Sequence, residues 1–582
     1  MKSGSNETVN AVLIPALCIL AIASACLAEQ PWSGRQDHAD TRLKYRWFFS
    51  FGYDRNRGDV EKIKSLIDTA ANHGLNGMVL SSFDLDSVTH WNEKDIIMLG
   101  EIADYCEKKR IELIPTGFSV GYGGGALGHD RNFAAALPAD LLVKSAGGKI
   151  VPDPGDNLLA NGDLEDQVNN RFKGYVFHDK PGEVSFVDTL AASGRTSIRF
   201  EHFGDFDYGH GRISQRVAVK PGRTYRLTVR IKTQELEPVS GIKAMVYSNG
   251  RSLAELQPNV KRTQDWTEMS LDYVNKDETE VVVYVGIWGG KSGKFWLDDL
   301  RFSEYGDLSD IVRRDGTPLE MKSRDRIKVF TEGKDFKPIQ CLRELDSVPI
   351  LPGSSISEGE HLELSCYKIP YVSHSWGKQI SLCMSNPKLY EYWEAEARKL
   401  HQVMKFKKVL LSMDEIRNGG GCLLCQKRGI SMAEILGDCI TRQHAIFKSI
   451  DPEIEVLIWS DMLDPAHNAH DNYYGVVGDF TGSFKYVPKD LTIMCWYHKI
   501  RDKSLGFFSK QGFSTLGAAY YDSADLSNCR EWLDSLRNTP KAQGIMYTTW
   551  ERKYGLLANF GDLVSGTIAE AGPATTRSGV IP

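Results

Sequence analysis

The sequence predicts an α/β protein, a closed (β/α)8 TIM barrel interrupted after its third strand by an all-β jelly-roll sandwich. Two observations lead to this prediction. Short apolar runs alternate with amphipathic helical patterns, three times before about residue 150 and five times after residue 386. Between these parts, from about residue 157 to 305, period-two alternation and turn residues replace the helical period.

The first three strands are predicted from apolar runs, and two amphipathic helices separate them. The helix over 59–72 places Val60, Ile63 and Ile67 on one face, and a second helical pattern covers 93–109. The three runs are 47–53, 77–83 and 111–118. Strands that alternate with helices in this way favour a parallel sheet.

The same alternation returns with a helical pattern over 386–404. Five further apolar runs follow, at 409–413, 455–459, 491–496, 514–520 and 544–550. Together with the first three they make eight β/α units, the number found in a closed barrel. An open, doubly wound parallel sheet remains the alternative architecture.

The predicted domain organisation follows from these patterns. Alternating stretches such as 224–230, with the Lys220-Pro221-Gly222 turn before them, indicate a separate sandwich. The expected parts are a signal peptide over 1–28, barrel strands one to three over 44–150, a β-sandwich over 155–305, a β-rich connecting segment over 306–386 and barrel strands four to eight over 387–570.

The first 28 residues predict export from the cytoplasm. An apolar stretch over 11–28 follows Lys2 and ends in small residues before Glu29, which is typical of a signal peptide. We therefore expect a secreted, periplasmic or cell-surface protein. An uncleaved anchor, or a lipoprotein attached through Cys26, is the alternative. No later stretch is long and apolar enough for a membrane span.

Charge argues against two classes of partner. The net charge of −6 and the absence of a basic run argue against nucleic acid and against an anionic membrane surface.

Aromatic and acidic residues gather at the predicted strand ends. The carboxyl ends of barrel strands form one rim, where active sites of such barrels lie. Flat rings suit the faces of sugars and carboxylates suit hydroxyl groups, so we expect a carbohydrate site there. The candidate binding residues are Trp459, Asp461, Trp496, His498, Tyr521, Tyr547 and Trp550.

The adjacent acids Asp414 and Glu415 directly follow the fourth predicted strand. Two neighbouring carboxylates raise each other's pKa, which favours one protonated acid near neutral pH. A protonated carboxyl group is what donates to a glycosidic oxygen. A capped helix N-terminus lined with acids is the structural alternative.

Three features stand at the ends of the predicted strands: Asp414-Glu415 after strand four, Trp459-Ser460-Asp461-Met462 after strand five and Trp550 after strand eight. In these features the barrel portions resemble the family-20 glycoside hydrolases, the β-N-acetylhexosaminidases. The resemblance implies that Glu415 is the acid/base and that Asp414 orients the 2-acetamido group of the substrate, whose carbonyl oxygen is the nucleophile. It also implies that Trp459, Trp496 and Trp550 surround the sugar ring and that Tyr521 or Tyr547 forms a hydrogen bond with the acetamido oxygen.

The insert resembles galactose-binding-like carbohydrate-binding modules in its opening, 157–165, and its closing, 295–300. Such modules often hold a structural calcium ion, for which Asp163, Glu165 and Asp299 are the candidates. The resemblance also implies a glycan-binding role, and a purely structural insert is the alternative.

The cysteines leave their chemistry open. Of eleven, Cys18 and Cys26 lie in the signal segment, and the odd remainder leaves a thiol without a partner in the chain. Cys422 and Cys425 follow strand four, and His467 and His470 follow strand five. These four could form a zinc site, but single pairs of this kind are common, so a local disulfide or free thiols are the expected explanation, and the metal of the barrel stays unknown.

The sequence thus predicts a secreted glycoside hydrolase that needs no cofactor for catalysis and acts on an oligo- or polysaccharide, for which the resemblance suggests a glycan containing N-acetylhexosamine. Asp461 and Glu551 are the alternatives if a protein carboxylate is the nucleophile. Leu411-Ser412-Met413 stands where the family has His-x-Gly-Gly, which favours a second hypothesis, a non-catalytic glycan-binding protein. A metal-dependent hydrolase built on the Cys/His loops is a third.

Overall fold

The computed structural model describes residues 43–177 and 179–566, so the predicted signal segment lies outside the described residues. Eight parallel strands close into a barrel, in which β1 pairs with both β2 and β30. In order, they are β1 (Tyr45–Ser50), β2 (Gly77–Ser81), β3 (Glu112–Gly117), β24 (Lys408–Leu411), β26 (Glu455–Trp459), β28 (Thr492–Cys495), β29 (Ser514–Tyr520) and β30 (Ala542–Thr548). The closed ring confirms the predicted fold class and removes the open-sheet alternative.

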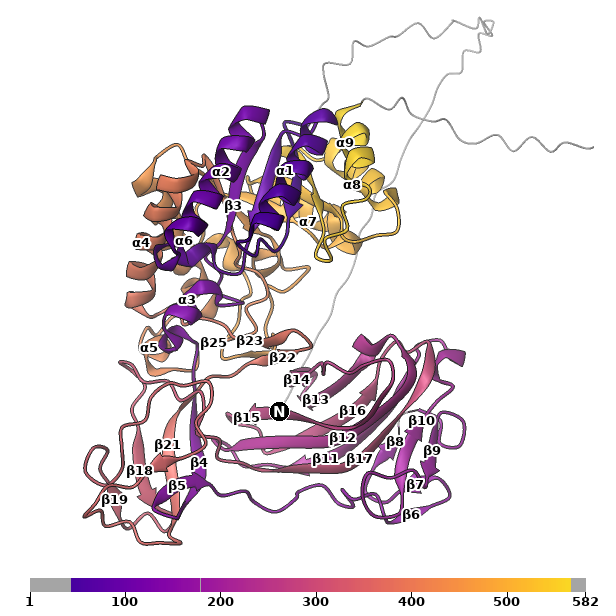
Figure 1. Ribbon diagram of the computed structural model, residues 1–582, viewed down its shortest axis with the longest axis vertical. Helices are drawn as coiled ribbons and strands as arrows, with labels where there is room; N and C mark the ends of the chain where they lie inside the picture. Colours follow the sequence, from indigo (N-terminus) through magenta and orange to yellow (C-terminus); the bar gives the residue numbers. More distant parts are fainter. Residues whose placement is uncertain (1–42, 178, 567–582) are drawn as a thin grey trace, which may run out of the picture. The chain divides into compact units, whose positions relative to one another are not determined.

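The start and the end of the described chain build the barrel together, in indigo and in orange to yellow in Figure 1. Its main helices are α1 (Arg57–Asn72), α2 (Glu93–Lys109), α4 (Pro387–Met404), α6 (Met432–Ile450), α7 (Arg501–Lys510), α8 (Ser527–Arg537) and α9 (Leu557–Ser565). Side-chain caps fix several helix starts, such as Asn92 before α2 and the capping box of Ser431 and Glu434 before α6. Between β26 and β28 the chain forms short 3₁₀ helices, η5 (Asp461–Leu463) and η6 (Ser483–Lys485), in place of the expected α-helix.

Side chains from all eight strands fill the barrel interior. The buried cluster includes Phe49 from β1, Trp459 from β26 and Met546 from β30. Phe51, Trp496 and Trp550 pack on this cluster while remaining partly exposed. The interior is therefore a packed core, and its aromatic upper layer forms the floor of the rim at the carboxyl ends of the strands.

The insert is a sandwich of two antiparallel sheets with its own apolar core, drawn mainly in magenta in Figure 1. One sheet has the order β15 (Gln264–Val274), β12 (Thr224–Glu237), β17 (Ser292–Glu304), β10 (Ser197–Phe200) and β9 (Ser185–Asp188). The other has the order β23 (Gly377–Gln379), β22 (Val372–His374), β14 (Arg251–Leu256), β13 (Ile242–Ser248), β16 (Glu280–Ile287), β11 (Gly211–Ala218) and β8 (Val176–Phe177). Strands β22 and β23 come from the connecting segment, and Leu256 of β14 pairs with Ser373 of β22.

A third β-sheet combines two stretches that the sequence analysis kept apart. Strands β4 (Leu137–Ala146) and β5 (Lys149–Pro152) were expected within the first barrel portion, yet they pair with strands of the connecting segment. Those strands are β18 (Glu320–Ser323), β19 (Val329–Phe330), β20 (Val348–Pro349) and β21 (His361–Lys368). Leu141, Val143 and Leu364 of this sheet lie in a separate buried cluster.

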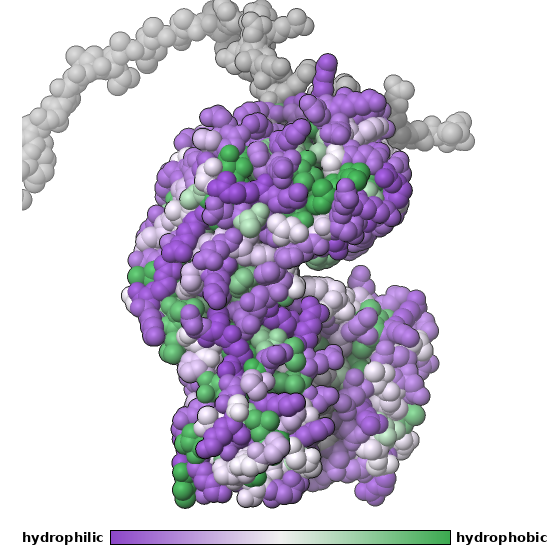
Figure 2. Space-filling view, turned by 60° about the vertical axis from the view of Figure 1, so that its left-hand side comes forward, coloured by the Kyte–Doolittle hydropathy of each residue, from purple (hydrophilic) through white to green (hydrophobic). Residues whose placement is uncertain are grey.

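The face seen in Figure 2 is largely hydrophilic, with hydrophobic residues in separate patches. Within residues 43–177 and 179–566, no helix combines the length and the apolar character that a bilayer span requires.

Candidate active site

A cavity of about 600 Å³ lies at the carboxyl ends of the barrel strands, a volume typical of small-molecule sites. Every barrel strand, or the loop that directly follows it, contributes to its wall. Its lining includes Phe51, Ser82, Phe83, Asp86, Ser119, Tyr122, Trp376, Ser412, Asp414, Glu415, Trp459, Trp496, Tyr521 and Trp550. The structure therefore contains the predicted rim, and the adjacent acids Asp414 and Glu415 both line its cavity.

Asp414 reaches the cavity by strand alternation. Ser412 and Asp414 line the cavity, whereas Met413 between them is fully buried in the core outside the barrel. Burial, together with the negative charges of Asp461 and Glu415, raises the pKa of Asp414 well above its usual range. Its Oδ1 atom has no hydrogen-bond partner among the described residues. Asp414 is therefore placed to keep its proton to higher pH than an ordinary aspartate and to present an unused oxygen to a ligand.

Glu415 enters the same cavity because its backbone is left-handed, with φ of 48°. Continued alternation would have turned this side chain away from its neighbour. Gly121 packs against the turn so closely that a Cβ there would lie 2.1 Å from the Asp414 carbonyl oxygen. Tyr122 donates a hydrogen bond to Oε2 of Glu415, and Nη2 of Arg417 lies 3.0 Å from Oε1. The glutamate is thus held in one orientation by a phenol and a guanidinium group.

Asp461 supports the backbone turn at Glu415 through hydrogen bonds. It is fully buried, and its Oδ2 accepts hydrogen bonds from the Glu415 backbone N–H at 2.9 Å and from Asn468 Nδ2 at 2.8 Å. Trp496 Nε1 lies 3.3 Å from Oδ1. Burial raises the pKa of Asp461 to about 6. Because its oxygens are already engaged and it does not line the cavity, Asp461 positions the site rather than contacting a ligand.

The β22–β23 hairpin braces Arg417. Arg417 Nη1 donates to His374 Nε2 at 3.0 Å and to the side-chain oxygen of Gln379. Gln379 Nε2 in turn donates to the Glu415 carbonyl oxygen at 3.0 Å. The connecting segment, for which the sequence indicated no function, therefore fixes the acid pair.

The predicted tryptophans form the apolar wall. Trp459, Trp496 and Trp550 all line the cavity. The rings of Trp496 and Tyr521 are stacked, with centroids 5.8 Å apart, and Trp550 packs edge-on against Phe51 at 5.2 Å. These rings pack against one another, so the wall is preformed and presents flat apolar faces.

Among the lining residues that the sequence did not reveal, Trp376 and Asp86 offer the most to a ligand. Trp376, at the tip of the β22–β23 hairpin, is 60% exposed and stacks on His374 with ring centroids 4.7 Å apart. Asp86, in η1 (Leu85–His90) after β2, is only 2% exposed. The signal for Asp86 was an acid shortly after a strand end. Trp376 had no such signal, because its hairpin joins the site only through long-range pairing.

Asp86 is a buried acid with a free oxygen. Its Oδ1 accepts a hydrogen bond from the Gly125 backbone N–H at 2.8 Å, and its Oδ2 has no partner among the described residues. Burial, and to a smaller extent the charges of Glu396 and Asp84, raise the pKa of Asp86 to about 7. The cavity therefore contains a second carboxyl group that is protonated in part at neutral pH.

The structure places three predicted residues elsewhere. Tyr547 is fully buried on the helix side of β30, where its ring stacks on Tyr520 at 4.1 Å and its hydroxyl bonds to the Lys553 carbonyl oxygen. Alternation explains this, since Met546 points into the barrel. His498 begins a 3₁₀ helix and turns toward α8, with Nε2 3.2 Å from Glu531. Glu551 is exposed and ion-paired with Lys553 at 2.6 Å, outside the cavity lining.

The proposed metal ligands do not assemble as expected. His467 packs between Trp496 and Tyr497, with ring centroids 4.4 and 5.0 Å away, and joins no cluster with Cys422 and Cys425. Within the described residues, the predicted calcium ligands Asp163, Glu165 and Asp299 form no common group of ligand atoms. The carboxylate of Glu165 accepts hydrogen bonds from the backbone and side chain of Arg195 instead. The three carboxylates are therefore not gathered into one ligand set here, and calcium binding by the insert stays a prediction.

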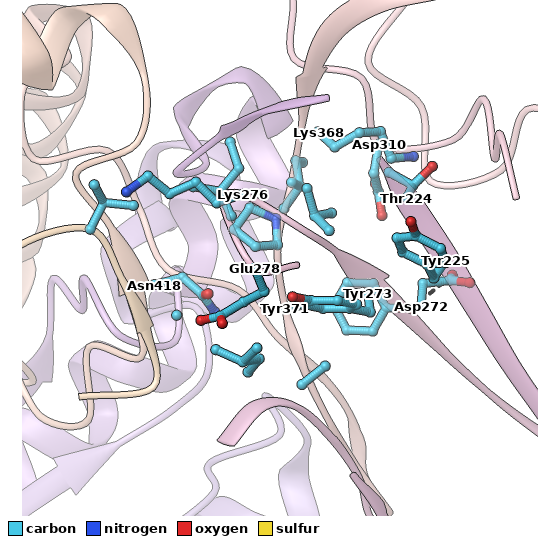
Figure 3. A pocket seen from close by; sticks show the side chains of 18 of the residues that line it. Thr224, Tyr225, Asp272, Tyr273, Lys276, Glu278, Asp310, Lys368, Tyr371 and Asn418 are labelled. Carbon is cyan, nitrogen blue, oxygen red and sulfur yellow. Dashed lines mark hydrogen bonds between the residues drawn. The ribbon is translucent and has the colours of Figure 1, made fainter. Parts of the chain in front are cut away.

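A second, smaller pocket of about 70 Å³ is shown in Figure 3. Several of its polar groups already bond to one another, as when the Tyr371 hydroxyl donates to Asp272 Oδ2 at 2.9 Å and Lys368 pairs with Asp307 at 3.2 Å. Ligand sites in proteins usually measure about 300 Å³ or more, so this pocket is small for a rival site.

A scan against protein-family models and a search of curated proteins found no match. Among solved structures, the chain is similar to a chitobiase from Flavobacterium johnsoniae, with 8% identity and a TM-score of 0.37, over 90% of this chain and 48% of that one. It is also similar to a rhamnosidase from Novosphingobium sp. PP1Y, with 9% identity and a TM-score of 0.30, over 87% of this chain and 55% of that one. A carbohydrate-binding module solved with β-1,4-galactotriose matches 25% of this chain over 98% of its own length, with 16% identity and a TM-score of 0.20.

Proposed function

We propose that this protein is a glycoside hydrolase, in which Asp414 and Glu415 are the catalytic pair. One observation carries the proposal. Two adjacent carboxyl groups face one cavity of about 600 Å³ whose walls are preformed aromatic faces. Apolar faces for sugar rings, combined with an acid that retains its proton, are the two requirements of acid-assisted glycosidic cleavage.

The geometry favours Asp414 as the proton donor. Burial keeps its pKa well above the usual range, whereas the Arg417 guanidinium balances a negative charge on Glu415. This distribution reverses the assignment that the family resemblance implies, in which Glu415 donates and Asp414 orients an acetamido group. The proton would pass from the Asp414 carboxyl to the glycosidic oxygen as the bond to the anomeric carbon breaks.

The second catalytic role then falls to Glu415 or to the substrate. Asp461 has both carboxylate oxygens engaged and lies outside the cavity lining, and Glu551 is ion-paired on the surface. Glu415 is the carboxyl group directly beside Asp414 in the cavity lining, placed to attack the anomeric carbon or to stabilise its positive charge. A substrate with a 2-acetamido group supplies its own nucleophile, and N-acetylhexosamine glycans remain the proposed substrate class.

The signal segment and the insert extend the proposal. The apolar stretch over 11–28 supports secretion, so the substrate would be an extracellular oligo- or polysaccharide.

Within the insert, Tyr208 is 76% exposed, and its carbonyl oxygen accepts a hydrogen bond from the Gly289 backbone N–H, next to Trp288. These aromatic side chains are the proposed contacts of the sandwich with a glycan.

Hydrolysis of a panel of aryl β-glycosides tests the proposal. The panel compares N-acetylglucosaminide and N-acetylgalactosaminide with glucoside, galactoside and fucoside. Cleavage confined to N-acetylated sugars would assign the nucleophile to the acetamido group, and cleavage of the others would assign it to Glu415. Glycan-array binding without cleavage of any aryl glycoside or of the bound glycans would replace the proposal by a non-catalytic glycan-binding function.

Trp376 offers a test of substrate binding at the cavity rim. Replacing Trp376 by Ala should raise KM about tenfold and leave kcat nearly unchanged, because a stacked ring contributes roughly 1.5 kcal/mol to binding. Stability should change little, since this side chain is 60% exposed. The control W376F retains a flat ring and should restore most of the affinity. A fall in kcat with constant KM would instead place Trp376 in the chemical step.

A further inference from the structure

Three cysteine side chains meet next to the loop that carries the acid pair. The Sγ atoms of Cys383 and Cys422 are 3.6 Å apart, those of Cys383 and Cys425 are 3.8 Å apart, and those of Cys422 and Cys425 are 3.7 Å apart. All three residues are buried, at 2%, 1% and 5% exposure. The sulfurs thus form a nearly equilateral triangle shielded from solvent.

The chain builds this triangle from two distant segments. Cys422 caps the short helix α5 (Leu423–Gln426) and Cys425 lies within it, so the three-residue spacing places both sulfurs on one side. Cys383 lies in the segment that leads into α4, where its backbone N–H donates to the Phe133 carbonyl oxygen at 2.8 Å. From the sequence, His467 and His470 were the candidates to join Cys422 and Cys425, but in the structure the third side chain of the group is Cys383.

A cation accompanies the three sulfurs. Nη2 of Arg314 lies 3.7 Å from Cys422 Sγ and donates to the Ala134 carbonyl oxygen at 3.1 Å. Three thiolates around a divalent ion carry one net negative charge, which is costly to bury without compensation. The Arg314 guanidinium provides the compensating positive charge. Three thiols alone are neutral and give no electrostatic reason for an arginine at this position.

We propose that Cys383, Cys422 and Cys425 bind one Zn²⁺ ion as thiolates. Zn–S bonds of about 2.3 Å in tetrahedral geometry place the sulfurs about 3.75 Å apart, which agrees with all three measured separations. A disulfide would single out one pair at about 2.05 Å, whereas this triangle favours no pair. Within residues 43–177 and 179–566, no further Cys, His, Asp or Glu joins the group, so the described side chains supply three of the ligands of a tetrahedral ion.

The ion would act on structure rather than on the reaction. It links the loop after β24, which carries Asp414, Glu415 and Arg417, to the segment that joins the β22–β23 hairpin to α4. Both segments also contact each other through Arg417 and Gln379. Zinc would therefore hold together the two segments that support Asp414 and Glu415, whether or not a substrate is bound.

Zinc content of the full-length secreted protein, purified without a metal-affinity step, tests the proposal. After dialysis against a weak chelator, elemental analysis should give about one zinc per chain, and stripping with a strong chelator under denaturation should release it. Adding Co²⁺ to the stripped, refolded protein should produce the intense near-ultraviolet sulfur-to-metal absorption of three thiolates. C383S should lower the zinc content at least tenfold, and C439S, which changes a buried cysteine of α6 outside the triangle, should retain it.

Other outcomes overturn the proposal without reference to enzymatic activity. Less than a tenth of a zinc ion per wild-type chain, when the protein is expressed with added zinc, would exclude the site even if the variants fail to fold. A Cys422–Cys425 or Cys383–Cys422 disulfide found by mass spectrometry would identify the triangle as a redox pair with a third thiol. Equal zinc content in wild type and C383S would place the metal elsewhere.

Discussion

Replacing Asp414 by Asn is expected to lower kcat by a factor of about 10² to 10⁴ on glycosides with poor leaving groups, such as natural disaccharides. The amide has nearly the shape of the protonated carboxyl group but cannot transfer an acidic proton to the leaving oxygen. The loss should be small on dinitrophenyl glycosides, whose leaving group departs without protonation. The measurement is kcat and KM for both substrate types at several pH values.

The comparison with Glu415→Gln assigns the two roles. If Glu415 is the nucleophile or the charge stabiliser, its replacement should reduce kcat on both substrate types, because bond cleavage itself loses support. Full activity of D414N on natural substrates, together with a leaving-group-dependent loss in E415Q, would return proton donation to Glu415. That result would match the roles implied by the family resemblance.

Asp464 provides the matched control. It is fully buried in the loop after β26, and its carboxylate accepts a hydrogen bond from the Ala466 backbone at 2.9 Å, but it does not line the cavity. D464N should therefore keep kcat and its pH profile close to wild type. An equal loss in D464N and D414N would show that kcat reports general damage to the loops rather than acid catalysis.

Replacing Asp86 by Asn is expected to change the pH dependence of stability. Burial raises the pKa of Asp86 from 3.8 to about 7, a difference worth up to about 4 kcal/mol. The unfolded chain loses this proton near pH 4, while the folded protein keeps it until about pH 7. The contribution of Asp86 to stability is therefore complete below pH 4 and is lost as the pH rises through 7.

Asparagine removes this titration and keeps an acceptor for the Gly125 N–H. Relative to wild type, D86N should gain up to about 4 kcal/mol in the free energy of unfolding between pH 4 and pH 8. Urea unfolding of both proteins at four or five pH values measures the difference. The control D104N makes the same substitution at an exposed acid on α2, away from the cavity. A constant difference between D86N and wild type across this range would mean that Asp86 is ionised in the folded protein.

The residue types alone were sufficient for part of the site. Trp459, Trp496, Trp550, Tyr521 and the acid pair were predicted because they directly follow strands, and all of them line the cavity. Tyr547 was misplaced although the same rule of alternation, counted from the inward-facing Met546, places it on the outer side of its strand. His498 was misplaced because a 3₁₀ helix starts at this residue and ends the alternation.

The sequence by itself determined the number of barrel strands, the position of the insert and the acid pair Asp414 and Glu415 that faces the cavity, because each depends on periodicity within a few residues of the chain. Tertiary structure alone decided which distant segments complete the site. Tyr122 meets Glu415 across 293 positions, and Cys383 meets Cys422 across 39. Trp376 arrives on a hairpin that pairs with a strand of the sandwich. Such contacts depend on strand pairing between remote parts of the chain, and no local pattern of residues encodes that pairing.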